Sequence, residues 1–577
     1  MPEVPVIEFR DFSFQYYSRK EPTLHNINLK INKGEKILIA GASGSGKSTL
    51  AHCLNGLIPH SYRGTITGEL FINGKSVAEQ SIFDRSKRIG TVLQDSDGQF
   101  VGLSVGEDIA FALENDCRPQ NEMKEIVRKT AELVDMGEFL KASPYELSGG
   151  QKQRVSFAGV MVDDVDILLF DEPLANLDPA TGKTAIDLID RIHREYDKTV
   201  IIIEHRIEDV LYRNIDRVIV IDDGHIVSDM SPDELMTTDI FKQNGIREPL
   251  YVTALKHAGI KVTQDMCAGR LDTLKLSDED KKKLIEWSSQ PVQKEKSGTE
   301  PLLELRHINF RYTDRKEILK DINIKIGAGE MVSIVGTNGA GKSTLAKVIC
   351  GFEVKDKGDI LFKGDSLWGY SIREIATHIG YVMQNPNQMI CNSFVYDEVA
   401  FGLRNRHMDE EEAKKRVEKA LRICGLYPFR NWPISALSFG QKKRVTIASM
   451  LVMEPEILIL DEPTAGQDYR HYTDIMEFLK SLNSAGITII MITHDMHLML
   501  EYTPHAIVLH NGQIRAEGTA VDILTDEAVV EDASLKLTSL YELALSIGMD
   551  EPQKLVGHFI DYEREAGKGE TYEDQAL

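Results

Sequence analysis

Short apolar runs alternate along this chain with longer segments in which apolar residues recur at helical spacing. The runs include Leu38–Ala40, Asp166–Phe170, Thr199–Glu204 and Arg217–Asp222. Short runs bounded by turn residues are typical of strands that are buried on both faces of a sheet. The alternation therefore predicts βα repetition around a mainly parallel sheet, which is an α/β fold.

The whole pattern occurs twice. GASGSGKSTL at Gly41–Leu50 returns as GTNGAGKSTL at Gly336–Leu345, and the later motifs return in the same order and at nearly the same spacing. Such a repeat predicts two copies of one domain. The expected organisation is a first domain at 5–242, an inter-domain segment with a linker at 243–301, a second domain at 302–524 and a C-terminal extension at 525–577.

Three further segments have a recognisable pattern. Helix-period stretches at 122–140 and 409–424 predict a helical subdomain inserted in each copy. The polar stretch 277–301 is rich in Lys, Glu and Ser, so we expect a solvated linker there. The C-terminal extension is predicted to form a short amphipathic helix followed by a charged tail.

Each copy contains a glycine-rich loop with the spacing GxxxxGKS, which follows an apolar run and precedes a helical segment. The glycines allow backbone N–H groups to wind around a phosphate, the lysine neutralises phosphate charge, and the serine hydroxyl is a ligand for Mg²⁺. The expected nucleotide-binding residues are Gly41, Ser43, Gly44, Gly46, Lys47, Ser48 and Thr49 in the first copy, and Gly336, Asn338, Gly339, Gly341, Lys342, Ser343 and Thr344 in the second.

A later apolar run in each copy ends in two acidic residues, Asp171-Glu172 and Asp461-Glu462. An aspartate at such a strand end can hold Mg²⁺, and the glutamate that follows can polarise the attacking water as a general base. Each copy is therefore expected to bind a nucleoside triphosphate with Mg²⁺ and to hydrolyse it.

A third motif, LSGGQKQRV at Leu147–Val155 and LSFGQKKRV at Leu437–Val445, lies between the loop and the acidic pair. With it, most of the chain resembles the ATP-binding-cassette (ABC) ATPases. The resemblance implies two tandem P-loop cassettes that bind ATP and Mg²⁺ and close head to tail within one polypeptide. In that arrangement Ser148, Gly149 and Gly150 complete the site built on Lys342, and Ser438 and Gly440 complete the site built on Lys47.

The resemblance also implies further site residues. They are a glutamine that contacts Mg²⁺ and the water, a switch histidine that contacts the γ-phosphate, and an aromatic residue that stacks on adenine. The matching positions are Gln94 and Gln384, His205 and His494, and Tyr16 and Tyr312.

Two motifs depart from the family pattern. Phe439 replaces the first glycine of the LSGGQ motif, and Glu204-His205-Arg206 replaces the more usual THD. Neither change removes an expected phosphate, metal or water ligand, so both sites are expected to be chemically complete. We also expect Phe439 to face away from the nucleotide.

The residues after the two glutamines resemble those of the energy-coupling-factor (ECF) branch of vitamin and metal importers. The first copy reads DSDGQF followed by SVGEDIAFALEN, and the second reads NPNQM followed by FVYDEVAFGLRN. The resemblance implies an ATP-hydrolysing subunit that works with an integral membrane coupling subunit and a substrate-binding membrane subunit. A fused ATPase of a sugar-type importer and a tandem-cassette ATPase acting on ribosomes remain alternatives.

Charge and composition narrow the possible partners. The net charge is −23 with a pI near 5.2, whereas a nucleic-acid-binding protein is expected to present a basic domain. The six cysteines form no CxxC pair, which argues against a zinc site or a disulfide framework. No apolar run approaches the roughly 18 residues that cross a bilayer. We therefore expect a peripheral protein at the cytoplasmic face of the cell membrane, with no nucleic-acid partner.

Overall fold

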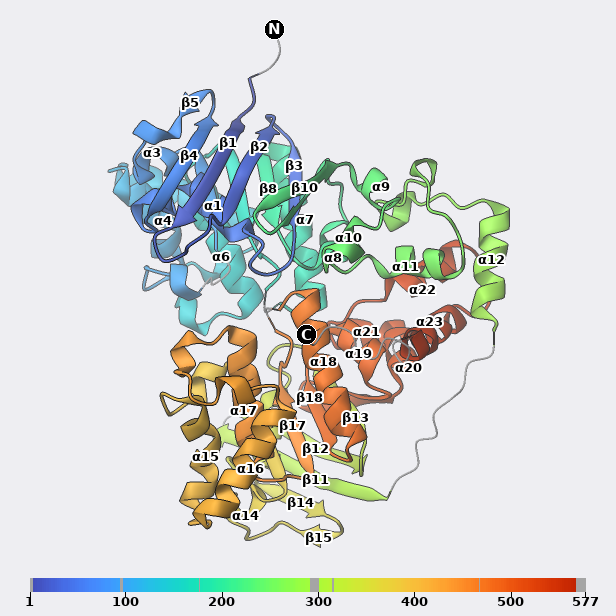
Figure 1. Ribbon diagram of the computed structural model, residues 1–577. Coiled ribbons are helices and arrows are strands. Elements are labelled where there is room, and N and C mark those ends of the chain that lie inside the picture. The colour runs from blue at the N-terminus through green and yellow to red at the C-terminus, as the bar shows by residue number, and fades with distance from the viewer. Residues whose placement is uncertain are drawn as a thin grey trace. The chain divides into compact units, whose positions relative to one another are not determined.

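The computed structural model describes residues 4–93, 97–175, 177–290, 300–313, 316–465 and 467–566 (Figure 1). The chain divides into two compact units, one formed mainly by residues up to 287 and the other mainly by residues from 288 onward. The boundary falls inside the predicted inter-domain segment. No helix in the described ranges is both long and apolar enough to cross a membrane.

A mainly parallel six-stranded sheet forms the centre of the first unit, in the order β10-β9-β3-β8-β7-β6. Only β10 runs antiparallel to its neighbour. The strands are β3 (Lys36–Ala40), β6 (Ile89–Val92), β7 (Ile167–Asp171), β8 (Thr199–Ile203), β9 (Arg217–Asp222) and β10 (His225–Met230). β3, β7 and β8 are buried along their whole length, as their apolar sequences predict.

A four-stranded antiparallel sheet, in the order β2-β1-β4-β5, accompanies the parallel sheet. Its strands are β1 (Ile7–Tyr16), β2 (Leu24–Ile31), β4 (Gly64–Ile72) and β5 (Lys75–Ser76). Side chains of both sheets pack in one hydrophobic core with the helix α1 (Lys47–Asn55). The antiparallel sheet was not among the elements that the sequence pattern predicted.

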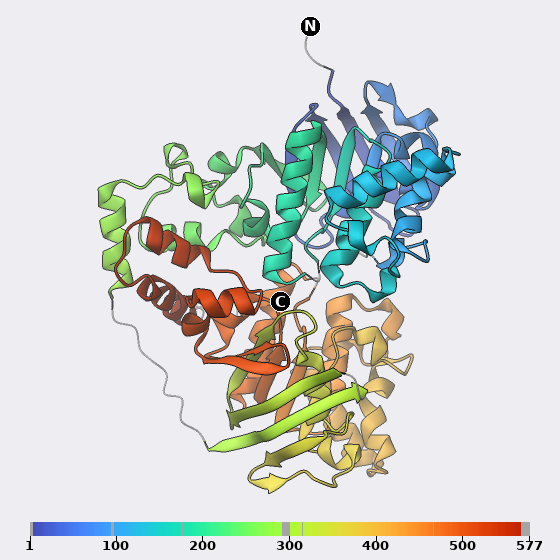
Figure 2. The ribbon, with the colours of Figure 1, turned by 180° about the vertical axis from the view of Figure 1, so that it is seen from behind.

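The second unit repeats this architecture. Its parallel sheet has the order β16-β17-β18-β13-β19-β20, and its antiparallel sheet has the order β12-β11-β14-β15. Figure 2 shows the long strands β11 and β12 side by side. The strands are β11 (Pro301–Thr313), β12 (Lys316–Gly327), β13 (Met331–Gly336), β14 (Lys357–Phe362), β15 (Asp365–Ser366), β16 (Ile379–Val382), β17 (Ile457–Asp461), β18 (Thr488–Ile492), β19 (His505–His510) and β20 (Gln513–Gly518). The α/β fold with two copies is confirmed.

Helices surround the two sheets of each unit. In the first unit they are α1, α2 (Leu57–His60), α3 (Ile82–Ser86), α4 (Val105–Asn115), α5 (Gln120–Leu133), α6 (Gly149–Met161), α7 (Pro179–Tyr196) and α8 (Ile207–Val210). In the second unit they are α13 (Lys342–Ile349), α14 (Ile372–Ile375), α15 (Val395–Asn405), α16 (Glu410–Ile423), α17 (Phe439–Leu451), α18 (Tyr469–Ser484) and α19 (Met496–Tyr502).

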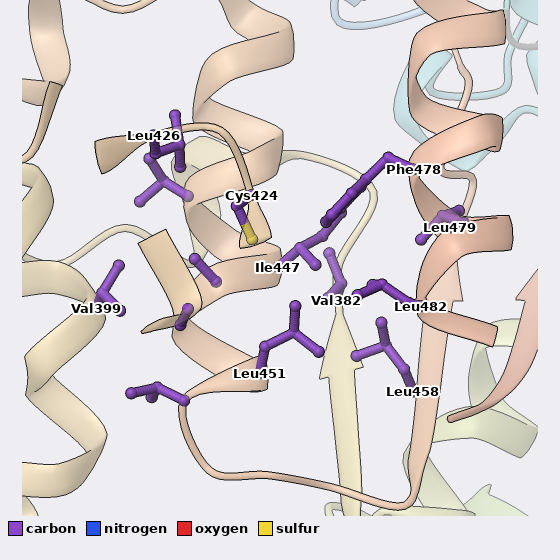
Figure 3. Close-up of a cluster of buried hydrophobic side chains, with 14 of the residues drawn as sticks. Val382, Val399, Cys424, Leu426, Ile447, Leu451, Leu458, Phe478, Leu479 and Leu482 are labelled. Carbon is purple, nitrogen blue, oxygen red and sulfur yellow. The ribbon is translucent and has the colours of Figure 1, made fainter. Parts of the chain in front are cut away.

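The predicted helical subdomains are α4–α6 and α15–α17, whose helices pack on one another. α5 ends at Leu133 rather than at 140, because Asp135 takes a φ of +57° that a helix cannot continue. A single core joins the second subdomain to the sheet. Figure 3 shows Ile447 and Leu451 of α17 beside Leu458 of β17 and Leu482 of α18. This core fixes the start of α17 relative to the strand that carries Asp461.

The residues that follow the last strand of each cassette are mostly helical. The predicted first domain ends with α9 (Pro232–Leu235) and α10 (Ile240–Gln243), and the inter-domain segment forms α11 (Leu250–His257) and α12 (Asp278–Ser288). The predicted second domain ends with α20 (Ala520–Leu524), and the C-terminal extension forms α21 (Glu527–Asp532), α22 (Ser539–Ser546) and α23 (Gln553–Ala566).

The prediction of a solvated linker at 277–301 was wrong for its first part. α12 buries Leu284 and Trp287, and the Trp287 ring lies 6.4 Å from the His257 ring at the end of α11. The polar residues of this stretch form the exposed side of an amphipathic helix. Residues 291–299 lie outside the described residues.

Candidate functional site

The glycine-rich loops follow the central strands β3 and β13 and lead directly into α1 and α13. Each loop lysine is buried and folds back over its own loop. Lys47 Nζ donates to the carbonyl oxygens of Gly41 (2.9 Å) and Ala42 (2.8 Å), and Lys342 Nζ makes the same pair of bonds to Gly336 (2.8 Å) and Thr337 (3.0 Å). Burial lowers the pKa of Lys47. Each loop therefore surrounds the ammonium group of its own lysine. This group could exchange its bonds to the loop carbonyls for bonds to a phosphate.

Glycine is required where these loops meet the sheet. A Cβ on Gly41 would lie 2.2 Å from the Ile221 carbonyl oxygen, and one on Gly336 would lie 1.9 Å from the Leu509 carbonyl oxygen. A side chain at either position would force the loop away from the sheet. The close approach places the loop N–H groups at the end of the strand, where the following helix begins.

The expected metal-binding aspartates lie at the ends of β7 and β17 and are both buried. Asp171 Oδ1 is buried with no hydrogen-bond partner among the described residues. Burial, with a contribution from the Glu172 charge, raises the pKa of Asp171 to about 6. Asp461 Oδ2 accepts a hydrogen bond from the Tyr381 hydroxyl at 3.0 Å. A buried carboxylate oxygen without a donor fits a divalent cation, which would supply the missing positive partner.

Each glutamate of the acidic pairs is bonded to the switch histidine of its own unit. His205 Nε2 donates to Glu172 Oε1 at 2.9 Å, and His494 Nδ1 donates to Glu462 Oε1 at 2.7 Å. Both glutamates take left-handed backbone conformations, with φ of +50° and +46°. The structure therefore brings together the two groups that the sequence assigned to the attacking water and to the γ-phosphate.

The LSGGQ-type motifs open the helices α6 and α17. Ser148 and Ser438 are the N-cap residues, and each forms a reciprocal capping box with the glutamine three residues later. A Cβ on Gly149 would come no closer than 3.9 Å to Leu177, so this position has room for a side chain. Phe439 occupies the equivalent position and is 45% exposed. The phenylalanine is therefore accommodated without displacing the helix start.

Comparison with known proteins agrees with this arrangement. A family model described as ABC transporter matches residues 24–175 and 319–465, each a span from the second antiparallel strand to the acidic pair. This chain belongs to the ABC transporter ATP-binding family. Members of the family bind and hydrolyse ATP, and the two units are its cassettes. A second model, described as ATP-binding cassette cobalt transporter, matches residues 238–310.

Relatives match over nearly the whole chain. A protein of Clostridium perfringens (strain 13 / Type A), described as an ABC transporter ATP-binding protein, is 56% identical over 98% of this chain and 100% of its own length. One of Enterococcus faecalis (strain ATCC 700802 / V583) is also 56% identical, over 98% and 100%. Among solved structures, CbiO1 of Clostridium perfringens, described as part of the ABC transporter complex cbiONQ, is 38% identical over 40% of this chain and 93% of its own, with a TM-score of 0.37.

The aromatic residues expected to stack on adenine lie beside the phosphate loops. The Tyr16 hydroxyl is 3.1 Å from Thr49 Oγ1, and the Tyr312 hydroxyl is 3.3 Å from Thr344 Oγ1. In the first cassette Tyr62 adds a second ring, edge-on to Tyr16 with centroids 6.4 Å apart. Both tyrosines therefore lie beside the phosphate loops, and their stacking on adenine stays a prediction.

The glutamines are only partly described. Gln94 lies outside the described residues. Gln384 follows β16, and its carbonyl oxygen accepts a hydrogen bond from Lys443 Nζ at 3.1 Å. Lys443 also donates to the Glu462 carbonyl oxygen at 2.7 Å, and burial lowers its pKa to about 8. Lys443 thus connects the segment of Gln384 to Glu462.

Sequence reasoning missed Lys443, Tyr381 and the role of Glu204. Glu204 is fully buried and accepts hydrogen bonds from the backbone N–H groups of His205 (2.9 Å), Arg206 (3.2 Å) and Leu174 (3.1 Å). Glu204 therefore joins the segment of His205 to the segment that follows Glu172. Comparison of the two copies contains a signal for two of these residues. Glu204 follows an apolar strand at a position where the second cassette has Thr493, and Lys443 stands where the first cassette has Gln153.

Proposed function

We propose that this ATPase is the energy-coupling subunit of an ECF-type importer, which drives uptake of a vitamin, a metal ion or a similar small solute. Its partners would be an integral membrane coupling subunit and a substrate-binding membrane subunit, and it would sit peripherally at the cytoplasmic face of the membrane. The family model described as cobalt transporter supports this proposal. The relation to CbiO1, which is described as part of cbiONQ, is consistent with it.

The site geometry supports a common mechanism for both cassettes. Lys47 and Lys342 would exchange their bonds to loop carbonyls for bonds to the phosphates of ATP. Glu172 and Glu462 would orient the attacking water as general bases, and the histidine bonded to each would hold it in place and contact the γ-phosphate. Ser48 with Asp171, and Ser343 with Asp461, would hold Mg²⁺, with Gln94 and Gln384 as further ligands. Bound Mg²⁺ would neutralise charge on the phosphates.

The closing surfaces are a separate part of the proposal. Ser148, Gly149 and Gly150, with Ser438 and Gly440, would contact the γ-phosphate through the N-terminal N–H groups of α6 and α17. The support is the family resemblance together with the position of each serine as an N-cap.

The observation that carries the coupling role is a group of exposed apolar side chains beside the segment that follows Gln94. Leu103 is 84% exposed and Val101 is 63% exposed, immediately before α4, and Phe111 on α4 is 42% exposed. In the second cassette, Phe401 of α15 occupies the position of Phe111 and is 44% exposed. Apolar groups left in water at equivalent places in both cassettes favour a protein partner with an apolar face.

The test is recovery of the protein with membranes from cells that express its partners. We expect Leu103→Asp combined with Phe111→Asp to release the protein into the soluble fraction while its affinity for ATP stays unchanged. Val227→Asp, at an exposed valine of β10 that is 44% accessible, is the matched control and should not change recovery. Recovery mainly with ribosomes, without an integral membrane partner, would contradict the importer role.

Asp108 is unsuitable for this test, although its place in the DxAF sequence suggests a docking residue. Its Oδ1 accepts hydrogen bonds from the N–H groups of Val101 (2.8 Å) and Gly102 (3.1 Å), so a charge reversal would break the loop itself. Glu398 bonds the equivalent loop of the second cassette through Cys391 and Asn392. Asp397, one residue earlier, is instead paired with Arg404 at the surface.

A further inference from the structure

A tyrosine holds the expected metal-binding aspartate in the second cassette. Tyr381 lies on β16, whose neighbour β17 ends at Asp461, and Tyr381 is paired with Ile459 in the register of the two strands. Its hydroxyl donates to Asp461 Oδ2 at 3.0 Å. The ring is buried and packs edge-on against Phe352, with centroids 5.8 Å apart. The hydroxyl is therefore fixed on one oxygen of the carboxylate.

No equivalent of this bond is found among the described residues of the first cassette. Thr91 occupies the same register position on β6, paired with Leu169 two residues before Asp171. Thr91 Oγ1 and Asp171 Oδ1 are both buried, and neither has a hydrogen-bond partner among the described residues. The threonine side chain is too short to replace the tyrosine hydroxyl, so this carboxylate oxygen is not held from the strand.

We propose that Tyr381 is a positioning residue that orients Asp461 for a divalent cation, and that the second cassette consequently binds this cation more tightly than the first. The inference rests on the proposed function, in which both sites hold Mg²⁺. An ionised carboxylate can accept about four hydrogen bonds or ligand contacts, so one tyrosine hydroxyl leaves room for the cation and its water. Hydrogen bonds to a ligating carboxylate fix its orientation and raise metal affinity.

The test is a titration with Mn²⁺, whose free form is measured by electron paramagnetic resonance, in the presence of ADP. The full-length chain carries Lys47→Ala, so that nucleotide-dependent Mn²⁺ binding reports the second site. Tyr381→Phe keeps the ring and removes only the hydroxyl. We expect it to weaken Mn²⁺ binding by about 10-fold or more, while ADP affinity measured in EDTA stays unchanged.

Two control variants distinguish a specific loss of Mn²⁺ affinity from a general effect of the substitution on folding. Tyr251→Phe removes another buried tyrosine hydroxyl, one that donates to the Ala268 carbonyl oxygen at 2.8 Å in the inter-domain segment, and should leave Mn²⁺ affinity unchanged. Thr91→Val in a Lys342→Ala background removes the unpartnered hydroxyl near Asp171 and should likewise leave Mn²⁺ affinity at the first site unchanged.

The outcomes separate the inference from the function on which it rests. Absence of any nucleotide-dependent Mn²⁺ binding in the Lys47→Ala parent would contradict the proposed cation site itself. Mn²⁺ binding that is present in the parent and equal or tighter in Tyr381→Phe would overturn only the role of Tyr381. A loss for Thr91→Val as large as that for Tyr381→Phe would overturn the proposed difference between the cassettes.

Discussion

The two cassettes share the groups that would contact the substrate and differ in the groups that hold them. In both, a lysine folds over its loop and a histidine bonds the glutamate proposed as general base. Beside the histidine, however, the first cassette has the buried carboxylate Glu204, which accepts three backbone N–H bonds, whereas the second has Thr493, which accepts one from Asp495 at 2.9 Å.

The difference shows how a duplicated site can change while its chemistry stays the same. Glu204 and its bonds to Leu174 and Arg206 form one unit, and the second cassette has a smaller one at Thr493. A buried polar group must keep its partners, so such changes come in sets. Two other supporting positions also differ between the cassettes. The second cassette has Lys443 and Tyr381 where the first has Gln153 and Thr91.

The largest expected effect tests whether the shared groups are equivalent. Glu172→Gln combined with Glu462→Gln should leave ATP binding intact and lower steady-state turnover by about 10²- to 10⁴-fold, because each site loses its general base. Release of phosphate from ATP measures this effect.

The single variants then divide the activity between the cassettes. If both sites turn over, each single variant retains part of the activity and traps ATP only in its own site. One variant with full activity and the other with none would show instead that one cassette is catalytic and the other regulatory. Undiminished turnover in the double variant would exclude the general-base role.

The next effect concerns the groups that differ. Glu204→Ala leaves the buried N–H of Leu174 and the partly buried N–H groups of His205 and Arg206 without their acceptor, and each buried unpaired group costs about 1–3 kcal/mol. Thr493→Ala removes the bond accepted from Asp495 (2.9 Å) and the longer bond that Thr493 Oγ1 donates to Glu462 Oε2 (3.5 Å), so its loss of unfolding free energy should be smaller. Urea unfolding followed by fluorescence compares the two variants, and equal losses would show that the Glu204 bonds do not act as a unit.

The smallest expected effect is a pH dependence of the free energy of unfolding that arises in the second cassette and not in the first. Arg217 at the start of β9 pairs with Glu35 and Asp229. His505 at the start of β19, the equivalent strand of the second cassette, pairs with Glu330 and Glu517. The bond to Glu517 is the main cause of the raised pKa of His505.

A raised pKa means that the folded state holds the proton more tightly than the unfolded state. This contribution is fully present below the unfolded pKa and is lost as pH rises through the folded pKa. Because the pair is partly exposed, the loss should be at most about 1 kcal/mol. His505→Arg should abolish it in urea titrations between pH 6 and 9. If the pH dependence of the unfolding free energy persists in His505→Arg, another titratable group is its cause.

The parts of the fold that could be predicted are those with strong local signals. The apolar runs predicted the central strands, and the loop and acidic motifs lie at the ends of these strands in each unit. The closing role of the LSGGQ-type residues stays a prediction. The antiparallel sheets were missed, because half-exposed strands such as β4 carry little apolar pattern. α12 was interpreted as a linker because Leu284 and Trp287 are the only buried apolar residues in its otherwise charged and polar sequence.

The supporting residues of the site could not be predicted for a different reason. The role of Glu204 depends on the N–H of Leu174, thirty residues away in the chain, and that of Tyr381 on a neighbouring strand. Such contacts are set by sheet order, which a sequence motif does not contain. Comparing the two copies position by position would have marked both residues as unusual, without revealing what they touch.

The left-handed backbone of the two catalytic glutamates has a consequence for how the duplicated chain has been maintained. A residue other than glycine in this conformation costs about 1–2 kcal/mol, and glycine would remove the cost. An idle cassette would be free to make that exchange and gain stability. Both cassettes keep a glutamate at φ of +50° and +46°, which is the outcome expected if selection has acted on turnover in each of them.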